Sequence, residues 1–209
     1  MNRLEARQVA FSYHRKELFR GLNIGLSAGE CIGILGPSGS GKTTIGRLLS
    51  GYEVPSSGTV LLNGQELPRK GFCPVQLVGQ HPQLAFDERM KMGNALKETG
   101  MDPVCNQDIL ELVGIKNEWL DRYPIELSGG ELQRFCIARA LNRDTKYVIA
   151  DEMTAMFDAI TQARLMKLLK SIQNERNIGI LLITHNEALA RKMCDKIIDM
   201  EALKDQALK

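Results

Sequence analysis

A glycine-rich segment carries the clearest chemistry in this sequence. It matches the pattern G-x-x-x-x-G-K-[ST] in full, between an apolar run and a stretch that favours helix. Glycine lets a backbone wrap closely around phosphates, and the start of a helix adds partial positive charge. Lys42 is placed to reach the β- and γ-phosphates of a nucleotide, and Thr43 to offer its hydroxyl to Mg²⁺. The complete motif argues against a loop that binds nothing. The predicted phosphate-binding residues are Gly36, Pro37, Ser38, Gly39, Ser40, Gly41, Lys42, Thr43 and Thr44.

Two adjacent carboxylates, Asp151 and Glu152, supply the second feature that phosphate chemistry needs. They directly follow the apolar run 147–150, which predicts a buried strand that ends at them. We expect Asp151 to hold Mg²⁺ through water, and Glu152 to act as the general base that polarises an attacking water. Solvated carboxylates at a strand end would be the simpler interpretation if the glycine-rich segment were absent.

Strand and helix patterns alternate around these residues. Apolar runs at 31–35 and 178–183 are typical of strands covered on both faces, and 159–174 has leucine and isoleucine at helical spacing. This alternation predicts an α/β protein with a parallel sheet. Residues 82–128 carry helical patches broken by glycine and proline, which indicates a mostly helical insertion. The other expected strands are 3–12 and 18–26 (joined by a polar turn that includes His14 and Arg15), 59–62, 75–78 and 196–200, and the other expected helices are 42–50, 92–98, 107–113, 130–143 and 186–193.

Composition narrows the class of protein. The chain has 209 residues, 44% hydrophobic and 25% charged, with a net charge of only +2, as expected of one globular domain. Without a basic excess or a basic stripe, we expect no nucleic-acid partner. The five cysteines form no CxxC or Cys/His cluster, so we expect free thiols in a reducing cytosol and no zinc or iron–sulfur site. Neither a signal peptide nor an apolar run of membrane-spanning length is expected.

The segment 127–134, which reads LSGGELQR, resembles the signature of the ATP-binding cassette (ABC) ATPases. The signature lies between a phosphate loop and a strand that ends in Asp-Glu, in the order that the family shows. The resemblance implies that this helix start faces the γ-phosphate held by an opposite subunit. Taken alone, the segment predicts a helix N-cap, which is compatible with that role. The residues concerned are Ser128, Gly129, Gly130 and Glu131.

Four further positions match the family one by one. The resemblance implies that Tyr13 stacks on adenine, although a strand aromatic packed in the core is the alternative. It implies that Gln80 contacts Mg²⁺ and water, and that His185 touches the γ-phosphate. Asp158 resembles the aspartate that communicates across the dimer, in the sequence Ala-Met-Phe-Asp where the family usually has Ser-Ala-Leu-Asp.

The resemblance implies an ABC ATPase fold: a P-loop core with a mostly parallel sheet, an N-terminal antiparallel β subdomain and an inserted helical subdomain. The expected organisation is a single domain, 1–209, with a nucleotide-binding core at 1–81 and about 133–209 and a helical subdomain at about 82–132. It also implies that ATP and Mg²⁺ are bound in a head-to-tail dimer, between Lys42 of one subunit and Ser128 of the other.

A compact single cassette resembles the separate ATPase subunit of a bacterial ABC importer. Residues 81–90 partly resemble a stretch of the oligopeptide, dipeptide and nickel importers, with Asp87-Glu88 in place of Asn-Pro. The implied partners are transmembrane permease subunits, an identical or different second ATPase subunit and, indirectly, a solute-binding protein. The implied location is the cytoplasmic face of the inner or plasma membrane. The alternatives are a soluble ABC ATPase of assembly, repair or phosphonate metabolism, and a nucleotide-binding regulatory subunit with negligible turnover.

Overall fold

The structure is a computed structural model that describes residues 2–13 and 16–207, so His14 and Arg15 of the expected turn lie outside the described residues. The chain divides into two compact units, which are described one at a time below. The first unit comprises Met1–Leu77, Lys146–Glu152 and Lys170–Lys209, and the second comprises Val78–Thr145 and Met153–Leu169. The functional division into a core and a helical subdomain at about 82–132 stays a prediction.

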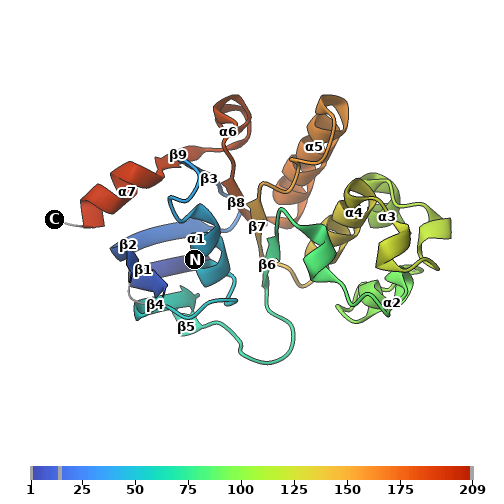
Figure 1. Ribbon diagram of the computed structural model, residues 1–209, viewed down its shortest axis with the longest axis horizontal. Helices are drawn as coiled ribbons and strands as arrows, with labels where there is room; N and C mark the ends of the chain where they lie inside the picture. Colours follow the sequence, from blue (N-terminus) through green and yellow to red (C-terminus); the bar gives the residue numbers. More distant parts are fainter. Residues whose placement is uncertain (1, 14–15, 208–209) are drawn as a thin grey trace. The chain divides into compact units, whose positions relative to one another are not determined.

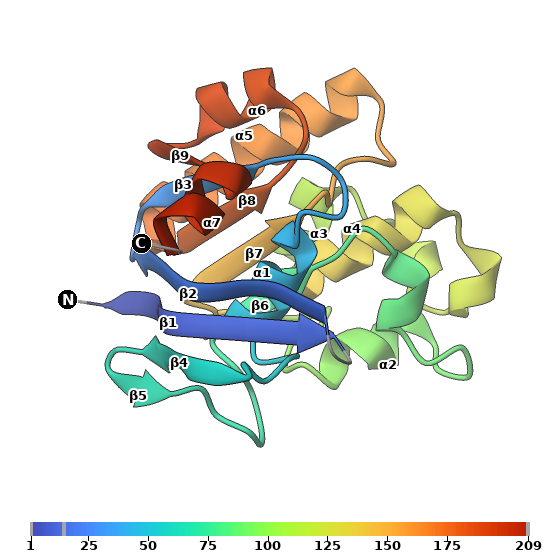
Figure 2. The same cartoon turned by 60° about the vertical axis from the view of Figure 1, so that its left-hand side comes forward.

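An antiparallel sheet lies at the beginning of the first unit. Its strand order is β2-β1-β4-β5, and Figure 2 shows these strands side by side. Leu4 pairs with Leu26 on one side and with Leu62 on the other, so apolar side chains of three strands meet on one face. The strands are β1 (Arg3–Tyr13), β2 (Lys16–Ser27), β4 (Ser57–Leu62) and β5 (Gln65–Glu66).

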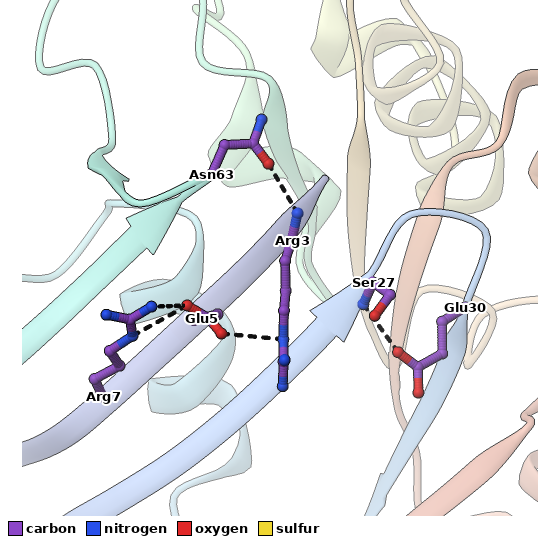
Figure 3. A network of polar contacts seen from close by, with 6 residues as sticks. All are labelled: Arg3, Glu5, Arg7, Ser27, Glu30 and Asn63. Atoms are coloured by element: carbon purple, nitrogen blue, oxygen red, sulfur yellow. Dashed lines mark hydrogen bonds and ion pairs between the residues drawn. The ribbon is translucent and has the colours of Figure 1, made fainter. Parts of the chain in front are cut away.

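Polar contacts hold the ends of these strands at the surface (Figure 3). The backbone N–H of Arg3 donates to Asn63 Oδ1 at 2.8 Å, which joins the start of β1 to the turn after β4. Glu5 forms ion pairs with Arg3 and with Arg7, at 3.1 and 2.6 Å. Exposed ion pairs of this kind add at most about 1 kcal/mol each, so the apolar face provides most of the stability of this sheet.

The second sheet has the strand order β6-β7-β8-β3-β9. β3 pairs in parallel with β8 and with β9, and β7 pairs in parallel with β8. Every residue of β7 and β8 is buried, as the apolar runs predicted for strands covered on both faces. The strands are β3 (Cys31–Leu35), β6 (Val75–Val78), β7 (Tyr147–Asp151), β8 (Gly179–Ile183) and β9 (Lys196–Asp199).

Helix α1 (Lys42–Leu49) packs directly on this parallel sheet (Figure 1). The contact is made at Gly46, where an added Cβ would lie 3.1 Å from a side-chain carbon of Ile149 and 3.1 Å from one of Ile183. Since both distances are shorter than ordinary van der Waals contact, the helix can approach the strands this closely only because residue 46 has no side chain.

The second unit is mostly helical. Its core contains Met92, Leu96, Val113, Trp119 and Phe135, all of them buried. Helix α4 packs against α2, α3 and the 3₁₀ turn Pro82–Ala85. The helices that begin in this unit are α2 (Met92–Lys97), α3 (Gln107–Val113), α4 (Gly129–Ala140) and α5 (Ala159–Arg176), and the other 3₁₀ turns are Asn117–Trp119 and Pro124–Glu126.

Two helices follow β8 in the first unit, α6 (Glu187–Met193) and α7 (Met200–Ala207), and α7 packs against β2. The α/β class, the antiparallel N-terminal sheet and the parallel sheet agree with the prediction. Helix α7 was not predicted. Among the helices in the described part of the chain, none combines the length and the apolar character needed to cross a membrane.

Candidate nucleotide-binding and catalytic site

The glycine-rich loop lies between the end of β3 and the start of α1, as the motif predicted. Gly39 and Gly41 have φ angles of 79° and 102°, in a region that favours glycine. At Gly41 an added Cβ would also lie 2.9 Å from Leu18 Cδ2. The first backbone hydrogen bond of the helix runs from Ile45 N–H to Gly41 O, at 3.0 Å. The backbone N–H groups before Ile45 at the start of the helix therefore have no acceptor within it and can donate to an external acceptor.

The loop contains two buried polar side chains, Lys42 and Ser40, that are placed to bind a ligand. The buried ammonium of Lys42 donates to the carbonyls of Gly36 and Pro37, at 2.8 Å each, so it lies within the loop. The buried hydroxyl oxygen of Ser40 has no hydrogen-bond partner among the described residues. A buried hydroxyl without a partner is costly in a folded protein, and an anion with many acceptor oxygens would remove that cost.

Asp151 ends β7 and lies beside the loop, with 5% of its surface exposed. Burial raises the pKa of its carboxyl, although a hydrogen bond from Thr43 and the nearby Lys42 oppose the shift. The Thr43 hydroxyl therefore lies near the Asp151 carboxylate. Oxygen ligands of these two kinds, completed by phosphate oxygens and water, are the ones that Mg²⁺ prefers.

Glu152 and His185 form a pair at the same edge of the sheet. His185 Nδ1 lies 3.3 Å from Glu152 Oε1, and the imidazole is 73% exposed. The backbone N–H of Glu152 donates to Ile183 O at 3.0 Å, and its φ of 48° is in the left-handed region. Non-glycine residues adopt this conformation at a cost of about 1–3 kcal/mol and are frequent at functional sites. The fold therefore holds this carboxylate in an unfavourable backbone conformation.

Tyr13, the expected adenine-stacking residue, is 45% exposed rather than packed in the core. Its ring meets Phe11 edge-on, at 4.8 Å between centroids and 82° between planes. Phe11 in turn lies 6.4 Å from Phe19, which contacts the position of Gly41 in the loop. Aromatic side chains thus connect Tyr13 with the phosphate loop, and the exposed part of Tyr13 is where the predicted stacking on adenine would take place.

In the second unit, Ser128 is the N-cap of α4. Its hydroxyl accepts a hydrogen bond from the N–H of Glu131 at 3.3 Å, while the Glu131 carboxylate accepts from the Ser128 N–H and hydroxyl, at 2.8 and 2.9 Å. The Ser128 backbone N–H holds the pKa of Glu131 below its ordinary value. Behind this capping box, Met156 fits against Gly129, where a Cβ would lie 3.0 Å from its sulfur.

Gln80 is exposed and follows β6. The residue before it, Gly79, is fixed by its carbonyl, which accepts a hydrogen bond of 3.0 Å from Nε2 of Gln133. Gln133 lies on α4, and only 1% of its surface is exposed. The role of Gln133 in positioning Gly79 is not predicted from the sequence, because a glutamine next to the signature gives no indication of the backbone group that it binds.

Asp158 serves as a helix cap at the start of α5. Its Oδ1 accepts from the N–H groups of Ile160 and Thr161, and its Oδ2 from the Thr161 hydroxyl, at 3.0, 3.0 and 2.7 Å. Hydrogen bonds from Thr161 lower the pKa of Asp158. The expected communication across a dimer remains a proposal for this residue.

The candidate site in the first unit thus gathers residues from the carboxyl ends of three adjacent parallel strands, which is where α/β proteins bind their ligands. β3 leads to Lys42 and Thr43, β7 ends at Asp151 and Glu152, and β8 leads to His185. The other site residues predicted from the sequence lie in the second unit: Gln80, Ser128, Gly129, Gly130, Glu131 and Asp158.

Comparison with known proteins identifies the family. A family model described as ABC transporter matches residues 19–155, which is well over half of the chain. The chain belongs to the ABC transporter family.

Three similar proteins illustrate the relationship. A nickel import ATP-binding protein of Pseudomonas putida is 35% identical over 87% of this chain and 72% of its own length. A putative peptide import ATP-binding protein of Brucella abortus is 34% identical over 84% of this chain and 58% of its own length, so the chain spans little more than half of that relative. The solved structure of cbiO1 from Clostridium perfringens, part of an ABC transporter complex, has a TM-score of 0.75 at 25% identity and covers 94% of this chain and 83% of its own. The expected resemblance to peptide and nickel importers is confirmed.

Proposed function

We propose that this chain is the ATP-hydrolysing subunit of an ABC importer. The observation that carries the proposal is the convergence of Lys42, of Thr43 near Asp151, and of the Glu152–His185 pair at one edge of the parallel sheet. These groups supply a phosphate-binding cation, metal-binding oxygens and a base with a histidine beside it. The reaction is the hydrolysis of ATP by water to ADP and phosphate.

The residues present fit MgATP. The Ser40 hydroxyl, which has no partner in the described part of the chain, and the N–H groups at the start of α1 offer donors to phosphate oxygens. Lys42 would exchange its bonds to Gly36 and Pro37 for the β- and γ-phosphates. Thr43 and Asp151 would hold Mg²⁺, and for Gln80 the contact with Mg²⁺ and water that the family resemblance implies stays a prediction. When bound, Mg²⁺ neutralises charge on the phosphates.

Glu152 is the proposed general base, since its carboxylate is only partly exposed and lies beside Asp151 and His185. The contact at Nδ1 leaves the other nitrogen of His185 free for the γ-phosphate. In such reactions positioning and charge neutralisation provide most of the catalysis, and the base adds about 10²–10⁴-fold.

The active form in this proposal is a head-to-tail dimer. Ser128, Gly129 and Gly130 of one subunit would face the γ-phosphate bound by Lys42 of the other, because the start of α4 offers N–H groups and partial positive charge to an anion. Asp158 would lie near the same interface. ATP would then hold the two subunits together, and hydrolysis would release them.

The importer assignment is supported by the relatives, which are named for nickel import and peptide import. We infer transmembrane permease subunits as partners, an identical or different second ATPase subunit, and indirectly a solute-binding protein. Peptides or nickel and other metal chelates are the proposed solutes. The proposed location is peripheral, on the cytoplasmic face of the inner or plasma membrane.

The first test of this proposal replaces the base. Glu152→Gln should lower ATP turnover by about 10²-fold or more while ATP affinity is kept, and ATP should shift the variant to a dimer in size-exclusion chromatography. Glu98→Gln, an exposed glutamate of the second unit, is the control and should behave as the wild type. Unchanged turnover in Glu152→Gln would remove Glu152 from the proposed catalytic role.

The second test concerns the partners. A tagged chain is purified from detergent-solubilised membranes and its companions are identified by mass spectrometry. Recovery of a multi-span permease supports the importer assignment and identifies the solute class to examine. Recovery of soluble partners alone would favour a soluble ABC ATPase and leave the proposed ATP chemistry unchanged.

A further inference from the structure

Two cysteines that are 163 positions apart in the sequence meet in the first unit. Cys31 Sγ lies 3.4 Å from Cys194 Sγ. Cys31 begins β3 and is fully buried, whereas Cys194 directly follows α6 and is partly exposed. Nothing in the spacing of the cysteines along the sequence indicates this contact.

The backbone holds the two sulfurs in place from both sides. The N–H of Cys31 donates to Asp195 Oδ2, and the N–H of Asp195 donates to Cys31 O, each at 2.8 Å. One residue further on, Ile32 pairs with Lys196 in the β3–β9 ladder. On the inner side, Cys194 Sγ would lie 3.1 Å from a Cβ at Gly33. The two segments are therefore joined directly beside the sulfurs, which must approach from 3.4 Å to about 2.0 Å to form a bond.

The charges around the pair make the two thiols unequal. Cys31 donates a hydrogen bond to Cys194, which lowers the pKa of Cys194, and the nearby Lys170 acts in the same direction, whereas burial and Asp195 oppose it. The pKa of Cys31 is raised by the same hydrogen bond and by burial. The Lys170 ammonium is held by Met193 O at 3.5 Å and Asp195 Oδ1 at 3.9 Å. The partly exposed sulfur is therefore the better nucleophile.

We propose that Cys31 and Cys194 are a redox-reactive dithiol that hydrogen peroxide converts to a reversible intramolecular disulfide. The Cys194 thiol first loses its proton, and the thiolate attacks one peroxide oxygen; the O–O bond breaks, Cys194 becomes a sulfenic acid, and the hydroxide that leaves takes up that proton to give the first water. The Cys31 sulfur then attacks Cys194 Sγ; the S–S bond forms, the S–O bond breaks, and the hydroxyl leaves with the Cys31 proton as the second water. Two thiols have given two electrons to the peroxide.

The disulfide would fix the edge strand of the parallel sheet. β9 pairs with β3 alone among the described strands, and Cys194 lies two residues before it. Since the crosslink joins β3 at its first residue and the phosphate loop follows its last, nucleotide binding should persist in the oxidised form. The loop closed in the unfolded chain is long, so the crosslinked form should be markedly more resistant to heat.

The test uses the purified, fully reduced chain and hydrogen peroxide at near-stoichiometric amounts. The expected result is a monomer that has lost two hydrogens, a Cys31–Cys194 crosslinked peptide in mass spectrometry and a Tm higher by roughly 5 °C or more. Dithiothreitol should reverse all three changes. Cys105→Ser removes an exposed thiol elsewhere and should behave as the wild type.

Two variants separate the roles of the sulfurs. Cys31→Ser should accumulate a sulfenic acid at Cys194 that a dimedone probe captures, and Cys194→Ser should form neither the sulfenic acid nor the crosslink. Lys170→Met keeps both sulfurs and should slow the reaction several-fold. Mapping of the wild-type product overturns the proposal if it shows only an intermolecular disulfide through Cys105, a sulfinic acid at Cys194 beside a free Cys31, or an unmodified pair. This result is independent of ATP turnover, so it can fail without affecting the proposed function.

Discussion

The carboxyl edge of the parallel sheet and the start of α4 both carry clear motifs, but they differ in how the hydrogen-bonding needs of their polar groups are met. At the sheet edge, the Ser40 hydroxyl has no hydrogen-bond partner within residues 2–13 and 16–207, Lys42 is bonded to carbonyls of its own loop, and Glu152 has a left-handed backbone. At the start of α4, the side chains of Ser128 and Glu131 are bonded to each other's backbone N–H groups in a capping box. The first region thus has a buried side chain with no partner among the described residues, whereas in the second region the side chains are engaged and only backbone N–H groups remain.

This contrast indicates where binding energy is available. A phosphate ligand at the sheet edge would give the buried Ser40 hydroxyl a hydrogen-bond partner and would neutralise the buried charge of Lys42. Binding there should therefore stabilise the fold strongly. A ligand at α4 would use only backbone N–H groups and the partial charge of the helix, since the side chains are already engaged. We therefore expect substitutions in the first region to change nucleotide binding and stability much more than those in the second.

Lys42→Ala should have the largest effect. Because charge-assisted hydrogen bonds to the phosphates are lost, ATP affinity should fall by about 100-fold or more. Titration with a fluorescent ATP analogue measures this, and Lys146→Ala, at an exposed position before β7, is the matched control. Equal affinity in the two variants would show that the loop does not bind phosphate.

Glu152→Gly tests the backbone conformation at the base. Glycine adopts a φ of 48° readily, so the free energy of unfolding should rise by about 1 kcal/mol while ATP turnover is lost. Gln8→Gly, at a φ of 51° on β1 and remote from the proposed chemistry, should give a similar rise with normal turnover. Urea denaturation of both variants makes the comparison. Destabilisation of Glu152→Gly alone would mean that the glutamate side chain stabilises the fold.

Asp151→Asn tests the buried charge. Burial raises the pKa of Asp151, so the native state keeps its proton to a higher pH than the unfolded chain does. The contribution of this carboxyl to stability therefore falls as pH rises through the ordinary value of 3.8 and then the native value. Without nucleotide, Asp151→Asn should raise Tm by about 2–4 °C at pH 7, if the gain is near 1 kcal/mol, and by less near pH 4. Calorimetry at both pH values would show the opposite trend if the charged form were favoured by folding.

Glu131→Gln should have the smallest effect. Its carboxylate accepts from the Ser128 backbone, and this lowers its pKa, so the contribution of the carboxylate is present above its ordinary pKa and is lost as pH falls through the native value. At pH 7 we expect Tm to fall by about 1–2 °C, because glutamine can still complete a capping box. A fall as large as the shift in Asp151→Asn would contradict the contrast between the two regions.

The sequence allowed much of the first region to be predicted, because its chemistry is local. The loop, the strand before it and the helix after it are contiguous, so glycine spacing and apolar runs were sufficient. Helix α7 was missed because the strand pattern at 196–200 was extended into it. A signal was present, since Asp199 caps the helix by accepting from Glu201 N–H, and Met200 and Leu203 are buried at helical spacing.

Other features could not be predicted, because they depend on contacts between distant parts of the chain. The hydrogen bond from Gln133 to Gly79 joins residues 54 positions apart, and the Cys31–Cys194 contact joins β3 to the end of α6. The left-handed backbone at Glu152 arises where β7 ends beside Ile183, and its residue type favours no such conformation. Pattern analysis gives the residue types of a site, whereas tertiary packing determines their partners and strain.

The close approach of α1 to the sheet at Gly46 matters when ATPase activity is inferred from motifs alone. Lys42 and Thr43 belong to the same rigid helix as Gly46, which rests on Ile149 and Ile183. A bulkier residue at any of these three positions would move the cation and the hydroxyl together, away from Asp151 and His185. Such a chain would retain every motif that defines the family and yet have no ATPase activity. Among duplicated genes, loss of activity can therefore begin in the packing layer beneath the site, where an inventory of conserved motifs does not detect it.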